Sequence, residues 1–217
     1  MAQLDKPSIV IAAAATGTAA VLVFALLPIL SGALARRFEL DDVQTGLVAS
    51  AYFSVYALIA FSSSAWVRRF NWKLTALGGY AAMIIGLFLC LVADSFGLAS
   101  TSLAIVGAGA GLLFPISLTL VSDMEHTDRT YAIKLAAEQL VPAAVLFLLS
   151  SSLFVGYGLG TLLTAIISVV VLCLALSVAL PAKGDRGRHT ETGQGGSIGL
   201  AVMSLAALTV NFSGFAG

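Results

Sequence analysis

Charged side chains are scarce in this sequence. Asp, Glu, Lys and Arg make up 10% of its 217 residues, whereas a soluble domain carries roughly 25%. The formal net charge at pH 7 is +0, which gives no indication of a nucleic-acid partner. Hydrophobic residues account for 59% of the chain. A chain this apolar does not fold as a soluble domain, so we expect a lipid bilayer to be its solvent.

Cysteine and histidine are also rare. Cys90 and Cys173 lie inside apolar runs and are expected to pack rather than to form a disulfide or a metal site. His126 and His189 lie in polar segments, so neither can serve an intramembrane serine hydrolase. A pair of deep Asp residues and a glycine-rich phosphate loop are absent as well. We therefore expect no cofactor, no metal and no enzymatic activity.

Long apolar runs make up most of the sequence. Crossing a bilayer takes about 18 or more nearly uncharged residues, and seven runs meet this condition: 9–33, 45–67, 74–93, 98–121, 133–155, 159–180 and 198–217. The first is longer than the apolar region of a signal peptide, which is about 7–15 residues. The sequence therefore predicts an all-α, polytopic membrane protein, with six helices and a seventh that stops at Gly217.

A short cationic loop, residues 62–74, separates the second and third runs. Arg68, Arg69 and Lys73 lie within six residues, and Trp66 and Trp72 flank the arginine pair. Lys and Arg collect on the cytoplasmic side of a membrane, and Trp prefers the headgroup layer. We expect this loop to lie at the cytoplasmic face.

The other cations agree with that orientation. Of the eleven Lys and Arg residues, nine would lie on the side of the N-terminus and two on the opposite side. The nine are Lys6, Arg68, Arg69, Lys73, Arg129, Lys134, Lys183, Arg186 and Arg188, and the two are Arg36 and Arg37. This bias predicts a cytoplasmic N-terminus in a cell membrane, which we expect to be a bacterial inner membrane.

A polar, glycine-rich segment, residues 184–196, follows the sixth apolar run. This composition is typical of a flexible linker. We predict three parts: an N-terminal six-helix bundle (1–181), a cytoplasmic linker (182–197) and helix 7 (198–217), which would begin an absent C-terminal bundle.

The order of six helices, a linker and a seventh helix resembles the N-terminal half of a major facilitator superfamily transporter. The signature of that family is Gly-x-x-x-Asp-Arg-x-Gly-Arg-Arg between helices 2 and 3. The matching stretch here begins at Ser64, and Arg69 and Lys73 match basic positions. Ser64 replaces the first Gly, Arg68 replaces the Asp and Asn71 replaces the second Gly.

The fourth and fifth runs add to the resemblance. The fourth run contains Gly107, Gly109 and Gly111 followed by Pro115, which is similar to the glycine-rich helix 4 of that family. The fifth contains Pro142, where the family often has Gly-Pro. Gly107 and Gly111 stand four residues apart on one helix face, which favours close packing of helices; a backbone-lined substrate site is the alternative.

The resemblance implies a secondary active transporter that moves a small solute by alternating access of two bundles, with proton or ion coupling. Its partners would be the bilayer, an unknown small-molecule substrate, and a missing C-terminal half or a second copy of the chain. A degenerate half-transporter that acts only as a membrane scaffold or assembly subunit is the alternative, to which the departures from the signature give slight support.

Few polar residues within the runs could contact a substrate or a coupling ion. Glu138 is the carboxylate deepest within an apolar run, and Gln139 is next to it. Either Glu138 faces a cavity and takes up protons there, or it forms an ordinary pair with Lys134, four residues earlier on the same face. With the fifth helix starting at residue 133, its depth would be only about 6–9 Å.

Three further residues are candidates for the same role. Asn211 in the seventh run can hydrogen-bond a substrate or a neighbouring helix. Tyr56 and Pro28 lie within the second and first runs, where packing is the alternative role. The scarcity of deep charges argues against a strongly charged substrate.

Overall fold

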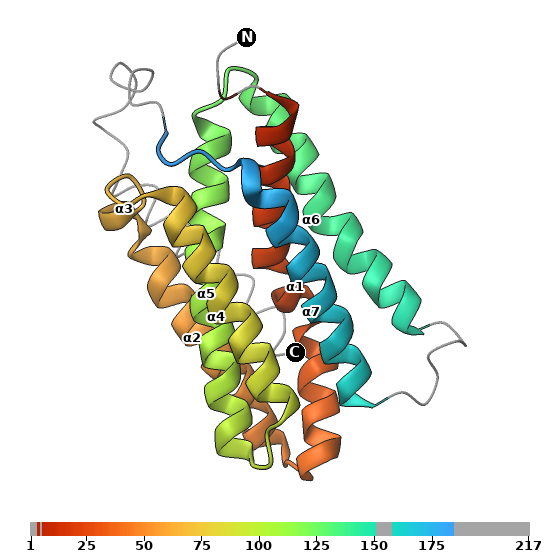
Figure 1. The fold of residues 1–217 in the computed structure, drawn as a ribbon. Coiled ribbons are helices and arrows are strands. Elements are labelled where there is room, and N and C mark those ends of the chain that lie inside the picture. Colours follow the sequence, from red (N-terminus) through yellow and green to blue (C-terminus); the bar gives the residue numbers. More distant parts are fainter. Residues whose placement is uncertain (1–3, 5, 151–157, 185–217) are drawn as a thin grey trace, which may run out of the picture. The chain divides into compact units, whose positions relative to one another are not determined.

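The computed structural model of the protein describes residue 4 and residues 6–150 and 158–184, and this part of the chain contains only helices, turns and loops (Figure 1). The elements are α1 (Pro7–Phe38), α2 (Asp42–Phe61), α3 (Ser63–Trp66), α4 (Trp72–Leu91), α5 (Phe96–Ser122), α6 (Thr127–Ser150), α7 (Leu159–Leu176) and the 3-10 turn η2 (Ser177–Ala179). Six of the described helices have the length and apolarity to cross a membrane. The prediction of an all-α, multi-pass membrane protein is confirmed.

The chain divides into one compact unit, Met1–Gly184, and a second, Asp185–Gly217. The predicted linker from residue 185 onward and the predicted seventh helix lie outside the described residues, so the three-part division stays a prediction.

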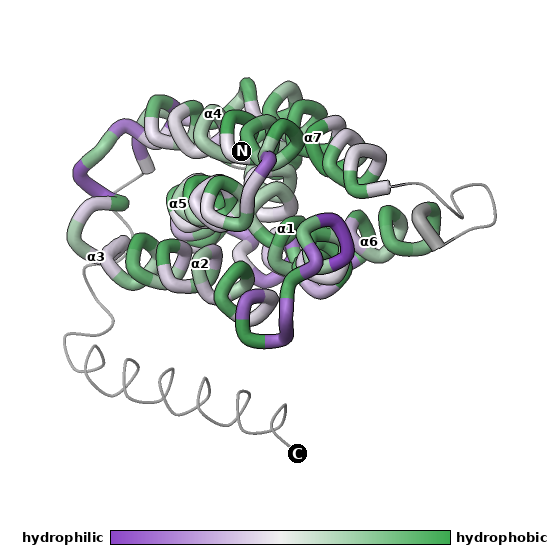
Figure 2. The backbone as a smooth tube through the Cα atoms, turned by 90° about the horizontal axis from the view of Figure 1, so that it is seen from below, coloured by the Kyte–Doolittle hydropathy of each residue, from purple (hydrophilic) through white to green (hydrophobic). Residues whose placement is uncertain are grey.

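Helices α1 and α5 occupy the centre of the first unit (Figure 2). In the most apolar 18-residue stretch of α1, 72% is buried, against 11% for α2. Helix α5 contacts α1, α2 and α4, while α1 contacts α6 and α7. The buried face of α1 is rich in alanine, with six between residues 12 and 20, so neighbouring helices can approach its backbone closely there.

Polar caps, rather than apolarity, fix where α2 and α4 begin. At α2 the Asp41 carboxylate accepts a hydrogen bond from the Gln44 N–H (2.7 Å), and the Gln44 side chain accepts one from the Asp41 N–H (3.2 Å). At α4 the Asn71 side chain accepts a hydrogen bond from the Leu74 N–H. These caps satisfy backbone donors at the helix ends, and they explain why both helices start before the predicted apolar runs.

Helix α6 begins at Thr127, six residues before the predicted residue 133. Polar residues can form the first turns of a helix. The negative charge of Asp128 in the first turn interacts favourably with the positive end of the helix dipole. Glu138 is eleven residues beyond Thr127 and therefore about 16 Å along the helix. The expected shallow position was wrong: Glu138 is near the middle of α6, and Lys134 does not belong among the loop cations.

Two glycines of α5 pack on the backbone of α2. A Cβ atom at Gly107 would overlap the carbonyl group of Tyr52, and one at Gly111 would lie 2.9 Å from the Tyr56 carbonyl oxygen. Both glycines therefore line the predicted packing face, and α2 covers it.

Gly109 faces the opposite direction, toward α4. A Cβ atom there would overlap the carbonyl oxygen of Gly79 and lie 2.9 Å from the Met83 nitrogen. The α4 and α5 backbones are thus in direct contact at Gly79 and Gly109, which leaves no room for a side chain at Gly109 and little at Gly79.

This contact predicts that Gly109→Ala lowers the free energy of unfolding by about 1–3 kcal/mol, because the methyl group must push two backbones apart. Gly78→Ala is the matched control, since an added Cβ at Gly78 has nothing within 4 Å. Thermal unfolding in detergent measures both variants. Equal melting temperatures for the two would contradict the predicted contact.

Candidate functional site

The described part of α6 carries a buried ion pair in the middle of its length. Lys134 and Glu138, four residues apart on one face, join Nζ to Oε1, and their side chains are 2% and 4% exposed. Transferring a single charge into so apolar a setting costs several kcal/mol. The two side chains therefore depend on each other for compensation.

Glu138 is accommodated because α1 has a glycine opposite it. A Cβ atom at Gly17 would overlap the Glu138 Oε1 atom, and it would lie 2.8 Å from the Ser117 Oγ atom and 3.0 Å from the Lys134 Cε atom. The ion pair thus lies against the bare backbone of α1, with Ser117 of α5 beside it.

Aromatic rings cover the ammonium group of Lys134. Its Nζ atom lies 5.3 Å from the centroid of the Phe114 ring and 5.8 Å from that of Tyr131, distances typical of cation–π contacts. Tyr56 of α2 continues this wall, with its ring centroid 6.3 Å from that of Phe114. It also stacks on Tyr52 at 6.0 Å. Tyr56, a predicted site residue, therefore belongs to the surroundings of the pair.

Hydroxyl groups fasten α1 to its other neighbours. The Ser117 hydroxyl donates to the Ala13 carbonyl oxygen (2.8 Å). Ser177 of η2 lies 3.0 Å from the Thr16 hydroxyl and 2.6 Å from the Tyr80 hydroxyl. This chain of hydroxyls joins α1, α4 and η2, and the sequence analysis did not anticipate it, because isolated Ser, Thr and Tyr residues in apolar runs carry no distinct signal.

The cationic loop forms a second polar centre at the end of the bundle. Arg68 donates two hydrogen bonds to Asp123, at 2.9 and 3.2 Å, and the Asp123 side chain is 0% exposed while that of Arg68 is 41% exposed. Arg69 and Lys73 are exposed. Arg68 occupies the Asp position of the family pattern, and its carboxylate partner comes from the end of α5. Asp123 was not among the residues predicted from the sequence, although it lies just after an apolar run.

Trp72 is buried within the protein, with 2% of its surface exposed. Its indole N–H donates to the Val67 carbonyl oxygen, and its backbone N–H donates to the Ala182 carbonyl oxygen at 2.9 Å. Gly184 packs against the Trp72 ring and the Asp123 carboxylate. The chain that leaves the bundle after η2 is therefore fixed beside the Arg68–Asp123 pair.

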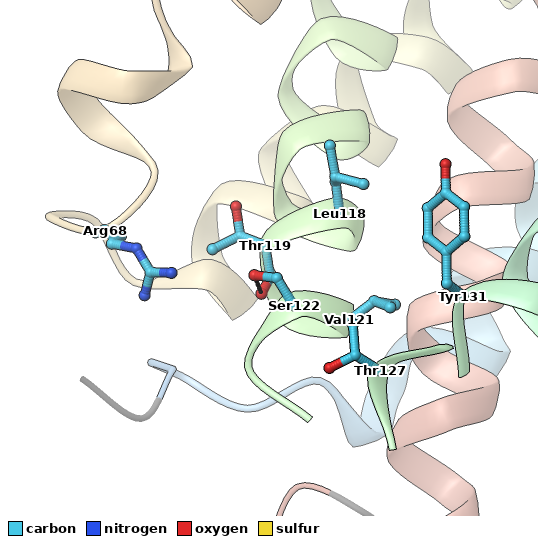
Figure 3. Close-up of a pocket in the computed structure, with 7 residues that line it drawn as sticks. All are labelled: Arg68, Leu118, Thr119, Val121, Ser122, Thr127 and Tyr131. Atoms are coloured by element: carbon cyan, nitrogen blue, oxygen red, sulfur yellow. Dashed lines mark hydrogen bonds between the residues drawn. The ribbon is translucent and has the colours of Figure 1, made fainter. Parts of the chain in front are cut away.

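An open cleft of about 430 Å³ lies between the ends of α5 and α6. Figure 3 shows Arg68 and Tyr131 on opposite sides of it. Its lining residues are Arg68, Leu118, Thr119, Val121, Ser122, Thr127 and Tyr131. Tyr131 connects the two centres, since it lines the cleft and its ring also covers Lys134.

The remaining predicted site residues are dispersed. Gln139 is exposed and points away from the buried face that carries Glu138. Pro28 is exposed within α1, whereas Pro115 and Pro142 are buried within α5 and α6. Asn211 lies outside the described residues. The structure therefore brings Tyr56 and Glu138 into one region and separates Gln139 and Pro28 from it.

No protein-family model matches the chain, and no curated protein sequence matches it. The fold is similar to that of a solved structure from work on substrate recognition in proton-dependent oligopeptide transporters, with a TM-score of 0.65 and 18% sequence identity. The similarity covers 95% of this chain and 47% of that one. The chain therefore has the fold of about half of that membrane transporter.

The Arg68–Asp123 geometry predicts that Arg68→Ala lowers the free energy of unfolding by about 1–3 kcal/mol, because a buried carboxylate loses its bidentate partner. Adding Asp123→Ala to this variant is expected to restore part of the loss, as a double-mutant cycle measures. Arg69→Ala, an exposed neighbour, is the control and is expected to leave thermal unfolding unchanged. Additive effects of Arg68→Ala and Asp123→Ala would refute the coupling.

Proposed function

We propose that the chain is the N-terminal half of a secondary active transporter of the major facilitator kind, which moves a small solute by alternating access. The observation that carries this proposal is the Lys134–Glu138 pair, buried in the middle of a membrane-crossing helix. The shared fold with half of a transporter supports it. Transport in this proposal is coupled to protons or another ion and not to ATP.

Burying charged side chains in an apolar interior is costly. Replacing a buried ion pair by apolar residues is often neutral or stabilising, so stability alone does not account for this pair. Ionisable residues within membrane helices mark substrate and proton pathways. Protonation of Glu138 would break the pair, and a rearrangement would then follow from the uncompensated charge on Lys134.

The proposed setting follows the sequence analysis. The bilayer of a cell, in this proposal the bacterial inner membrane, surrounds the protein, and the N-terminus lies in the cytoplasm. A second six-helix half, or a second copy of this chain, completes the transport path. The Arg68–Asp123 pair, with Arg69 and Lys73 beside it, forms part of the cytoplasmic gate. The protein in this proposal is not an enzyme.

The test begins with a growth and uptake screen of the complete protein in a strain that lacks its gene, which identifies a transported solute. Glu138→Gln then removes the titrating carboxyl group. We expect uptake in this variant to lose its dependence on external pH, with Gln139→Glu as a control that leaves the dependence in place. Unchanged pH dependence in Glu138→Gln would remove Glu138 from the coupling mechanism.

The contact with α1 predicts that Gly17→Ala reduces uptake at least about tenfold, since a misplacement of about 1 Å in a positioned site can cost a hundredfold. The methyl group would occupy the position of the Glu138 carboxylate. Gly46→Ala is the control, because an added Cβ there has nothing within 4 Å. Initial uptake rates, normalised to the amount of protein in the membrane, measure the effect. Wild-type rates in Gly17→Ala would contradict the assigned contact.

A further inference from the structure

We infer that the site around Lys134 binds an organic monoanion, and that one proton on Glu138 accompanies each anion. This inference rests on the proposed transport function and deepens it by naming the class of substrate. It is drawn from the charges around the pair, the direction that each member faces, and the aromatic wall.

Among the residues that the structure describes, no other charged side chain lies in the middle of a helix that packs near the pair. In the described helices that pack near it, charged residues stand only at the ends: Arg36 and Arg37 on α1, Asp42 on α2, and none on α5. The titratable side chains that face the pair are Tyr56 from α2 and Tyr131 from α6. Lys134 and Glu138 therefore balance each other.

The two members of the pair face different surroundings. The carboxylate of Glu138 lies on the α1 backbone at Gly17. The Cε atom of Lys134 also lies near Gly17, but its ammonium group is within cation–π distance of the rings of Phe114 and Tyr131, and Tyr131 lines the open cleft. A solute that enters from the cleft therefore meets the cation of the pair first.

The charge of the solute follows from the balance of charge within the pair. When Glu138 takes up a proton, its negative charge is lost and the buried ammonium group of Lys134 has no counter-charge, which is costly in an apolar interior. A solute with one negative charge restores the balance. A neutral solute does not, and a cation adds to the imbalance. One proton and one monoanion together carry no net charge, so each cycle is electroneutral.

The aromatic rings near the pair indicate the shape and polarity of the solute. Tyr56, Phe114 and Tyr131 form a wall contributed by three helices, with 43% of Tyr131 exposed. Rings of this kind pack against flat apolar groups. We therefore assign to the site an anion with an apolar, ring-sized body and a single acidic group. A single lysine also agrees with the expectation that the substrate is not strongly charged.

Three probes of the same size test this assignment: benzenesulfonate, benzenesulfonamide and benzylammonium. A sulfonate stays ionised, so protons taken up on binding come to the protein and not to the probe. With the complete protein in detergent at acidic pH, benzenesulfonate is expected to raise the melting temperature, because a ligand of the folded state stabilises it. In weakly buffered solution, binding is expected to consume about one proton per anion.

Variants of the pair make the test specific. Glu138→Gln mimics the protonated carboxyl group, so it is expected to bind benzenesulfonate at acidic and alkaline pH without proton uptake. Lys134→Gln is expected to bind it at least about tenfold more weakly, since a charge-assisted contact is lost. If Lys134→Gln does not fold, Lys134→Arg replaces it and is expected to retain binding. Gln139→Ala, an exposed neighbour on α6, is the control.

Stabilisation by benzylammonium or benzenesulfonamide in place of the sulfonate would overturn the assignment. Failure of Glu138→Gln to bind benzenesulfonate would do so too, because the ammonium group is then uncompensated by design. A complete protein that transports a neutral solute would refute this inference and leave the proposed function intact. Sulfonate binding by a protein that transports nothing would support the anion site and refute the proposed transport function.

Discussion

The approach of the Glu138 carboxylate to the α1 backbone is the constraint on which this helix bundle depends. A charged pair is stable among apolar helices only if neighbouring groups surround it closely. Gly17 makes that possible, since any side chain there would occupy the place of the carboxylate. The alanines around Gly17 keep the first half of α1 narrow. Small residues in α1 therefore determine where charge can be held in α6.

The polar contacts of the bundle fall into two groups with different physical roles. The hydroxyl chain through Ser177, together with the Arg68–Asp123 pair, joins elements whose backbones already pack tightly. The Lys134–Glu138 pair joins residues of a single helix, and α6 packs mainly on α1. The first group holds α1, α4, α5 and η2 as a frame, whereas the second places a charged pair against the α1 backbone at Gly17.

Much of the fold could be predicted from the sequence, because crossing a bilayer requires long apolar runs whatever their neighbours. The starts of α2 and α6 could not, since the polar residues that cap a helix or form its first turn lie outside the apolar run. The same limit placed Glu138 too shallow, although its pairing with Lys134 was foreseen from their spacing. The Arg68–Asp123 pair and the burial of Trp72 depend on segments that are distant in sequence. Such contacts arise only when α5 and the end of α7 meet the loop before α4.

Arg37, at the opposite end of the bundle from the α2–α4 loop, donates hydrogen bonds to the carbonyl oxygens of Leu91 and Ala93 at the end of α4. A guanidinium group keeps its proton at every pH that a cell encounters. The junction between α1 and α4 therefore keeps its charge as the pH changes. Acidification would thus leave the contact between α1 and the end of α4 intact.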